Sequence, residues 1–199
     1  MKQIETLIQK SDIDLKLYIK LLEKWQKAVN LVAASTLKDI WNRHILDSAQ
    51  LFPLIQNKKS LIDLGSGAGF PGLVLAILNK NNQGPLEKII LIESDVKKCL
   101  FLKEVIRQLS LNVEIINERI EKIESIKADI ITARALATVQ KLLELSRHLA
   151  NKDTTYLFLK GENVDEELKS VQFQLKIEKI KSITSSNSCI LKITEVYDG

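Results

Sequence analysis

The stretch LIDLGSGAGFPG, residues 61–72, decides the fold, because four of the chain's seven glycines fall within eight residues directly after a strand-like run. The pattern predicts a strand, a turn through Gly65, Gly67 and Gly69, and a helix that begins at Pro71. Glycines at these positions permit positive φ and let a ligand approach the backbone closely. We also expect the N–H groups of the turn and of the helix start to face an anionic or electron-rich ligand.

From residue 60 onward, short β-branched runs alternate with longer segments of helical spacing. The strand-like runs are SLIDLG, KIILIES, VEIINERI, ADIITARA and TTYLFLKG. Such alternation predicts βαβ units and a parallel sheet. Two further strand-like runs, residues 171–183 and 188–197, are separated only by TSSN and predict an antiparallel hairpin on the sheet edge. The predicted fold class is α/β, a Rossmann-like, doubly wound, mostly parallel seven-stranded sheet with a terminal antiparallel hairpin.

The N-terminal third is predicted to be helical. Residues 11–32 place large apolar side chains three and four positions apart, which is typical of an amphipathic helix. Ser11, followed by Asp14, predicts a start of the capping-box kind for this helix. Ser35 or Thr36 is expected to cap a further helical region, which should break near the proline at position 53.

Composition limits the possible classes of protein. A chain of 199 residues with 45% hydrophobic and 27% charged residues can form one well-buried domain with a modest extension. We predict a helical cap over residues 1–59 and a ligand-binding domain over residues 60–199, packed as one compact unit. Cys99 and Cys189 are neither clustered nor close to a histidine in sequence, so no metal site is predicted and both are expected to be core residues.

The same composition bears on location and partners. No apolar run approaches the ~20 residues that a membrane span requires. The first ten residues also lack the apolar block of a signal peptide. We therefore expect a cytoplasmic protein without a membrane partner. The formal charge of +4 permits a nucleic-acid partner but does not require one.

The spacing of the glycines narrows the choice of ligand class. A phosphate-binding P-loop requires Lys followed by Ser or Thr after its last glycine, and this stretch has neither, which disfavours ATP and GTP. The run G-x-G-x-G also departs from the dinucleotide pattern G-x-G-x-x-G, so NAD is the second choice. Glu93 ends the next strand and can accept hydrogen bonds from both hydroxyls of a ribose, which implies an adenosine. The alternative is that Glu93 caps the helix that starts after Ser94.

These features resemble a known class of enzymes. Asp63 before the glycine turn, an acid closing the second strand and a terminal hairpin are similar to class I S-adenosylmethionine-dependent methyltransferases. The segments RHILDS, GSGAGFPGLVLAI, LIESDVKKCLFLKEV, ERIE and TARALA together resemble the RsmG (GidB) family over nearly the whole chain. That family methylates nitrogen 7 of one guanine in 16S ribosomal RNA. The resemblance implies a bacterial rRNA methyltransferase that uses S-adenosylmethionine and acts on 16S rRNA or the small ribosomal subunit. We also expect a monomer.

The resemblance also implies which residues contact the cofactor: Gly65, Gly67, Gly69, Phe70, Glu93, Ile120, Glu121 and Arg134. Gly65 would lie beneath the methionine part, and Ile120 would cover the face of the adenine. Arg134, at the end of the fourth strand, would bind the cofactor carboxylate or an RNA phosphate. Without the resemblance, core packing for Ile120 and a solvated surface position for Glu121 are the simpler interpretations.

Arg43, His44 and Lys160 are the candidates for contacts with RNA. No catalytic residue is assigned, because nitrogen 7 of guanine has an exposed lone pair and no proton, so positioning dominates. Motifs for amino-group or carbon-5 methylation are missing from the sequence. Two alternatives stay open: a non-catalytic RNA-binding or ribosome assembly factor with a vestigial pocket, and a NAD-dependent oxidoreductase.

Overall fold

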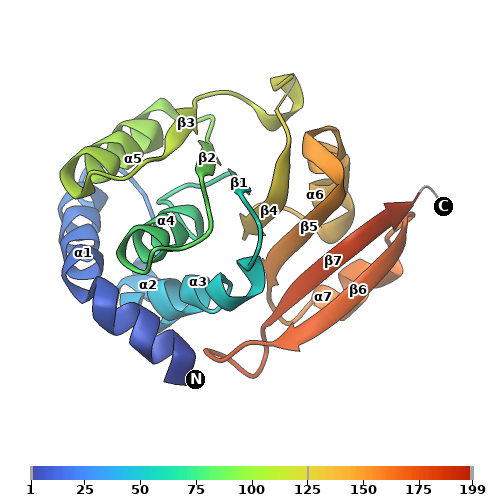
Figure 1. The fold of residues 1–199 in the computed structure, drawn as a ribbon, viewed down its shortest axis with the longest axis horizontal. Coiled ribbons are helices and arrows are strands. Elements are labelled where there is room, and N and C mark those ends of the chain that lie inside the picture. Colours follow the sequence, from blue (N-terminus) through green and yellow to red (C-terminus); the bar gives the residue numbers. More distant parts are fainter. Residues whose placement is uncertain (1, 125, 198–199) are drawn as a thin grey trace.

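The computed structural model describes residues 2–124 and 126–197 of the chain. Its centre is a seven-stranded sheet with the strand order β3-β2-β1-β4-β5-β7-β6 (Figure 1). The strands β1 to β5 are parallel to one another, whereas β7 runs antiparallel to both β5 and β6. This arrangement confirms the predicted α/β class, the doubly wound parallel sheet and the terminal antiparallel hairpin.

The elements have the following bounds. The strands are β1 Ser60–Leu64, β2 Lys88–Ile92, β3 Glu114–Ile116, β4 Ala128–Arg134, β5 Ala150–Lys160, β6 Gln174–Lys181 and β7 Cys189–Tyr197. The α-helices are α1 Lys2–Gln26, α2 Ala34–Leu37, α3 Asp47–Ala49, α4 Gly72–Asn81, α5 Val96–Leu109, α6 Val139–Ser146 and α7 Val164–Lys169. The helix α7 was not predicted from the sequence.

Helices cover both faces of the sheet. Figure 1 shows α1, α4 and α5 on one side, and α6 and α7 on the other. Alternate side chains of β1 follow this division: Leu61 joins the hydrophobic cluster that contains α4, whereas Ile62 and Leu64 join the cluster that contains α6. Because both faces are buried, the central strands are mostly apolar, as is typical of parallel sheets. Cys99 and Cys189 are both buried and unpaired, as expected.

The first helix is shifted toward the N-terminus relative to the prediction: it spans Lys2–Gln26, so the prediction of helix over residues 27–32 is wrong. It begins at Lys2, and Ser11 lies buried within it, where its Oγ donates to the carbonyl of Leu7 at 3.0 Å. The prediction that Ser11 starts a helix is therefore wrong. The hydroxyl of serine can donate a hydrogen bond to the carbonyl four residues earlier in the chain. A serine, which is common at the N-cap, is therefore also tolerated inside a helix. The apolar face predicted from the spacing does pack on α4 and α5.

The second helical region is a series of short pieces. Between α2 and α3 the chain forms a π-helix, Trp41–Leu46, and after α3 it forms a 3-10 helix, Phe52–Ile55. The prediction that Ser35 or Thr36 caps this region is wrong, because Ala33 is the N-cap and no side chain bonds to the helix start. The expected break is confirmed, since the proline at position 53 opens the 3-10 helix.

No helix in the described parts of the chain is both long enough and apolar enough to cross a membrane.

Candidate cofactor and substrate site

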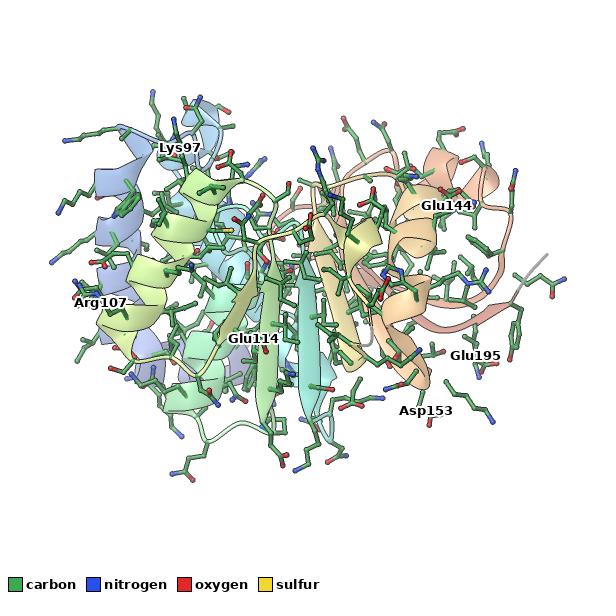
Figure 2. All side chains as sticks on the ribbon, turned by 90° about the horizontal axis from the view of Figure 1, so that it is seen from above. Lys97, Arg107, Glu114, Glu144, Asp153 and Glu195 are labelled. Carbon is green, nitrogen blue, oxygen red and sulfur yellow. The ribbon has the colours of Figure 1, made fainter. Side chains whose placement is uncertain are left out.

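A cavity of about 570 Å³ opens beside the carboxyl ends of the first strands, and we call it the first cavity. In Figure 2, Lys97 near the start of α5 lies at the upper edge of the sheet, whereas Asp153 near the start of β5 lies at the lower edge. The upper edge is therefore the carboxyl edge, where ligands bind in sheets of this kind. Most predicted site residues line the first cavity: Gly65, Gly67, Phe70, Glu93, Ile120, Glu121, Arg134, Arg43 and His44.

The glycine turn has the predicted backbone. Gly65 and Gly67 adopt φ values of +58° and +57°, a region that side chains rarely tolerate. A Cβ added at Gly67 would come no nearer than 3.8 Å to any neighbour, so the space above it is open. Gly69 is outside the lining of the cavity, and its Cβ would lie 2.4 Å from Leu73 Cδ1. Gly69 therefore permits close packing of the turn on α4.

The N–H groups of the turn do not face a ligand as expected. Those of Gly69 and Phe70 both donate to the carbonyl of Ser66, and that of Gly67 donates to Glu93 Oε2 at 2.9 Å. The expectation of an anion-binding turn is therefore wrong for these groups, because the turn itself and Glu93 already accept their hydrogen bonds. This agrees with the exclusion of a phosphate-binding loop on the basis of spacing.

Asp63 is a buried carboxylate beneath the turn. Its Oδ2 accepts from the N–H of Gly72 at 3.2 Å, and its Oδ1 accepts from Thr132 Oγ1 at 2.8 Å. Burial raises the pKa of Asp63 to about 6, although these hydrogen bonds oppose the rise. Through these two hydrogen bonds, the Asp63 side chain links the start of α4 to β4. In the sequence, Asp63 is the one acidic residue in an otherwise mostly apolar strand, and it was noted there only as part of the resemblance.

Glu93 lies directly after β2 and is 7% exposed. Its Oε2 accepts from Gly67 and its Oε1 accepts from the N–H of Asp95 at 2.8 Å. The cap of α5 is Asp95, which accepts from the N–H groups of Lys97 and Lys98, so the alternative that Glu93 caps this helix is wrong. Each carboxylate oxygen has two acceptor positions, which leaves capacity for hydroxyl groups of a ligand.

The segment after β3 supplies one wall of the first cavity. It forms a 3-10 helix, Ile120–Lys122, in which Ile120 is buried and Glu121 is exposed. The apolar side chain of Ile120 thus borders the cavity and also belongs to the core cluster on the α6 side. Both the core interpretation and the cavity interpretation of Ile120 are consistent with this position.

Arg134 connects the sheet to the helical cap. It is the last residue of β4, and its guanidinium donates to the carbonyl of Arg43 at 3.0 Å and to His44 Nδ1. It also lies 3.5 Å from the carboxylate of Asp47 and 5.4 Å from the centre of the Phe70 ring. The side chain is 17% exposed. Arg134 borders the first cavity, but these contacts hold its guanidinium against the cap.

His44 is buried, so the structure places this RNA candidate inside the molecule. Burial, with Arg134 nearby, lowers the pKa of His44 to about 3, and the ring is neutral at physiological pH. Because arginine can only donate, Nδ1 must accept, and Nε2–H then donates to Thr36 Oγ1 at 2.9 Å. Arg43, by contrast, is exposed at the rim.

Phe70 lies between the turn and the cap. Its ring stacks on His44, with centroids 4.7 Å apart, and lies 5.3 Å from the ring of Tyr18. The hydroxyl of Tyr18, from α1, donates to the carbonyl of Ala68 in the glycine turn. The N-terminal helical cap, residues 1–59, therefore contacts the glycine turn through aromatic side chains and one buried hydrogen bond. The sequence predicted only an amphipathic helix for the segment that contains Tyr18, and no contact with the turn.

A second cavity of about 810 Å³ adjoins the first. The two share the lining residues Thr36, Arg43, Arg134, Ala135 and Leu136. The second cavity also contains Asp47, Lys160 and Glu167, and the structure places the RNA candidate Lys160 here. The side chain of Leu136 lies between the cavities, and its Cδ1 would be 2.6 Å from a Cβ built on Gly65.

The first cavity fits S-adenosylmethionine. Its volume is within the range of small-molecule sites, the space above Gly67 is open, and its lining includes both the apolar side chain of Ile120 and the carboxylate of Glu93. Solved structures share the fold. A SAM-dependent methyltransferase from Aquifex aeolicus superposes with a TM-score of 0.60 at 17% identity, covering 80% of this chain and 95% of that chain. A ribosomal protein L11 methylase from Lactobacillus delbrueckii gives 0.57 at 16% identity, covering 74% and 76%.

The fold and the site define an S-adenosylmethionine-dependent methyltransferase of the Rossmann-like class. Residues 12–193 match the GidB family, described as rRNA small subunit methyltransferase G. A ribosomal RNA small subunit methyltransferase G from Paramagnetospirillum magneticum is 42% identical over 98% of this chain and 97% of its own. Another from Dinoroseobacter shibae is 45% identical over 94% and 97%. The chain belongs to this family, which confirms the resemblance found in the sequence.

Proposed function

We propose that this protein transfers the methyl group of S-adenosylmethionine to nitrogen 7 of one guanine in 16S ribosomal RNA. The observation that supports it most directly is the open first cavity over the glycine turn, with the Glu93 carboxylate at the carboxyl end of β2. Family membership supplies the substrate class, since the relatives carry the name ribosomal RNA small subunit methyltransferase G.

The residues of the first cavity have separate roles in this proposal. Glu93 accepts hydrogen bonds from the ribose hydroxyls, and Ile120 covers the adenine, with Glu121 beside it at the rim. The glycine turn lines the cavity beside the cofactor through Gly65, Gly67 and Phe70. Gly69 does not line the cavity but lets the turn pack closely on α4. Arg134 acts through the cap, because its guanidinium is already bonded to Arg43 and His44.

The chemistry requires little from side chains. Bound S-adenosylmethionine supplies a methyl group on a positively charged sulfur, which is already an electrophile. Nitrogen 7 of guanine carries a lone pair and no proton, so no side chain has to remove one. The protein therefore contributes orientation of the two reactants, which is the role expected of a rigid turn with an apolar side chain beside it.

The proposed partner is 16S rRNA, either naked or within the small ribosomal subunit, and the protein acts as a monomer in the cytoplasm. The exposed Arg43 at the rim contacts a phosphate of this RNA. His44 has no direct contact with RNA in this proposal, because it is buried and both ring nitrogens are bonded.

The test is methylation of small subunits from cells that lack this gene. Purified protein and S-adenosylmethionine with a labelled methyl group should place the label on nitrogen 7 of one guanine, located by nuclease mapping and mass spectrometry. Cofactor binding without transfer to any rRNA or subunit would support the assembly-factor alternative. Tight NAD binding without S-adenosylmethionine binding would instead support the oxidoreductase alternative.

A further inference from the structure

The second cavity contains a paired lysine and glutamate beside the cofactor site. Lys160 ends β5 and is 9% exposed, and its Nζ lies 2.6 Å from Oε2 of Glu167 on α7, which is 20% exposed. The cavity adjoins the first one at Arg134 and Leu136, so a planar ligand inside it borders the space where the cofactor lies. Nothing in the sequence drew attention to Glu167.

The pair has hydrogen-bonding capacity left over. Lys160 Nζ carries three donors, of which one goes to the carbonyl of Ala137 at 2.9 Å and one to Glu167. Glu167 uses Oε2 for Lys160 and for the N–H of Val139 at 2.9 Å, and its Oε1 has no partner among the described residues. One donor and one carboxylate oxygen therefore remain side by side at the cavity wall.

Asp47, another carboxylate of the second cavity, is more fully engaged. Asp47 accepts from Thr184 Oγ1 at 3.0 Å and from Gln50 Nε2 at 2.9 Å, and its other oxygen faces Arg134. Both of its oxygens are thus directed at protein groups. The Lys160–Glu167 pair is the better candidate for contact with a substrate.

We propose that the second cavity receives the target guanine and that the Lys160–Glu167 pair reads its Watson–Crick edge. That edge presents an acceptor at O6 followed by donors at N1 and at the 2-amino group. A lysine donor beside a carboxylate acceptor matches this order. Adenine presents a donor at its 6-amino group and then an acceptor at N1. The donor would face Lys160 and the acceptor would face Glu167, so neither charged group would gain a hydrogen bond. This inference rests on the proposed function, because nitrogen 7 faces the cofactor only if guanine is the substrate.

The proposal requires an unpaired target base. A base paired in a helix has no free Watson–Crick edge, so the guanine must be in a loop or be flipped out of the stack. The volume of about 810 Å³ is sufficient for a nucleoside. Glu167 is thus a specificity residue that contacts the base opposite the reacting edge.

The test compares two substrates and two variants. Small subunits are reconstituted with either guanine or inosine at the position that the wild-type protein methylates. Inosine lacks the 2-amino group but keeps nitrogen 7. We expect the wild type to prefer guanine by roughly tenfold or more in kcat/KM, since a hydrogen bond to a charged group is lost with inosine. In Glu167→Gln this preference should fall to about twofold or less.

The matched control is Glu166→Gln, because Glu166 is on the same helix, is highly exposed and pairs only with the neighbouring Lys169 in the described structure. It should keep the wild-type preference. Any intrinsic difference in reactivity between guanine and inosine is the same for all three proteins, so the change in preference isolates the contact. Cofactor affinity of Glu167→Gln should match that of the wild type. Its melting midpoint should fall, because the largely buried Lys160 loses its ion pair, but lower stability alone does not change the preference between the two substrates.

The outcomes separate the two proposals. A wild-type protein that methylates guanine and inosine equally, or a Glu167→Gln variant that is slower but keeps the preference, overturns the reading of the base and leaves the proposed function intact. A purely structural role for Glu167 predicts the second of these results. A wild type that methylates neither substrate overturns the proposed function and this inference with it.

Discussion

The two cavities at the carboxyl edge of the sheet are built differently. The floor of the first cavity is backbone from one glycine turn, and its buried acid Glu93 follows the neighbouring strand. The second is lined by charged side chains from the cap, from the end of β4, from β5 and from α7. The part of the first cavity that is made from one local turn can be recognised in the sequence, whereas the set of charged side chains in the second cavity appears only after folding. Arg134 borders both.

The largest expected effect is on the first cavity. Gly65→Asp should weaken binding of S-adenosylmethionine by about a hundredfold or more, because the backbone is at φ +58° and a Cβ there would meet the side chain of Leu136 at 2.6 Å. Titration calorimetry measures this directly. Gly161→Ala is the control, since Gly161 lies outside the first cavity and an added Cβ meets nothing within 4 Å.

Arg134, one of the residues shared by both cavities, is expected to affect stability. Arg134→Ala leaves the carboxylate of Asp47 without its ion pair, and burial already raises the pKa of that carboxyl. We expect the free energy of unfolding to fall by about 3 kcal/mol, as for other broken buried pairs, with loss of methylation. Urea unfolding measures the change. Arg107→Ala, which removes a mostly exposed pair with Glu104, should cost less than about 1 kcal/mol.

An Arg134→Lys variant separates charge from shape. Lysine keeps the charge near Asp47 but cannot donate to Arg43 and His44 from one planar group. Its stability should therefore lie between those of the wild type and Arg134→Ala. Wild-type stability in Arg134→Ala itself would show that the cap does not depend on this residue.

The sequence predicted the fold where local pattern and burial agree. The glycine turn, the five parallel strands and the hairpin all follow from residues that are adjacent in the chain. It failed at Ser11, because a hydroxyl that can cap a helix can equally bond backward inside one. It missed α7, a short helix whose residues are mostly charged and carry little apolar periodicity.

The prediction of the site has the same limit. The positions of Gly65 and Glu93 could be predicted because motif spacing fixes them. His44 could not be placed, since the groups that it contacts, such as Arg134 at a separation of 90 residues, are distant in the chain. Glu167 could not be found at all, because its pairing with Lys160 comes from the return of the chain through α7.

The raised pKa of Asp63, beneath the turn of the first cavity, predicts that the free energy of unfolding depends on pH. Its pKa is raised to about 6 in the folded state from 3.8, so the folded protein binds an additional proton between these values and becomes more stable as the pH falls. Lowering the pH from 7 to 5 should therefore add about 1 kcal/mol to the free energy of unfolding through this group. Urea unfolding of the wild type and of Asp63→Asn across this range gives the contribution by difference. Equal slopes for the two proteins would contradict it.

The smallest effect is expected at the exposed rim that the two cavities share. Arg43→Gln should weaken binding of small subunits about threefold and reduce the slope of log affinity against log salt by about one, because one phosphate contact is lost. Cofactor affinity should be unchanged, since the side chain is exposed and its backbone carbonyl, which Arg134 uses, is retained. Lys20→Gln on α1 removes the same charge from a residue that lines neither cavity, and should leave the salt slope as it is. If both variants lower the slope equally, the protein's overall charge attracts the RNA and the rim has no special role.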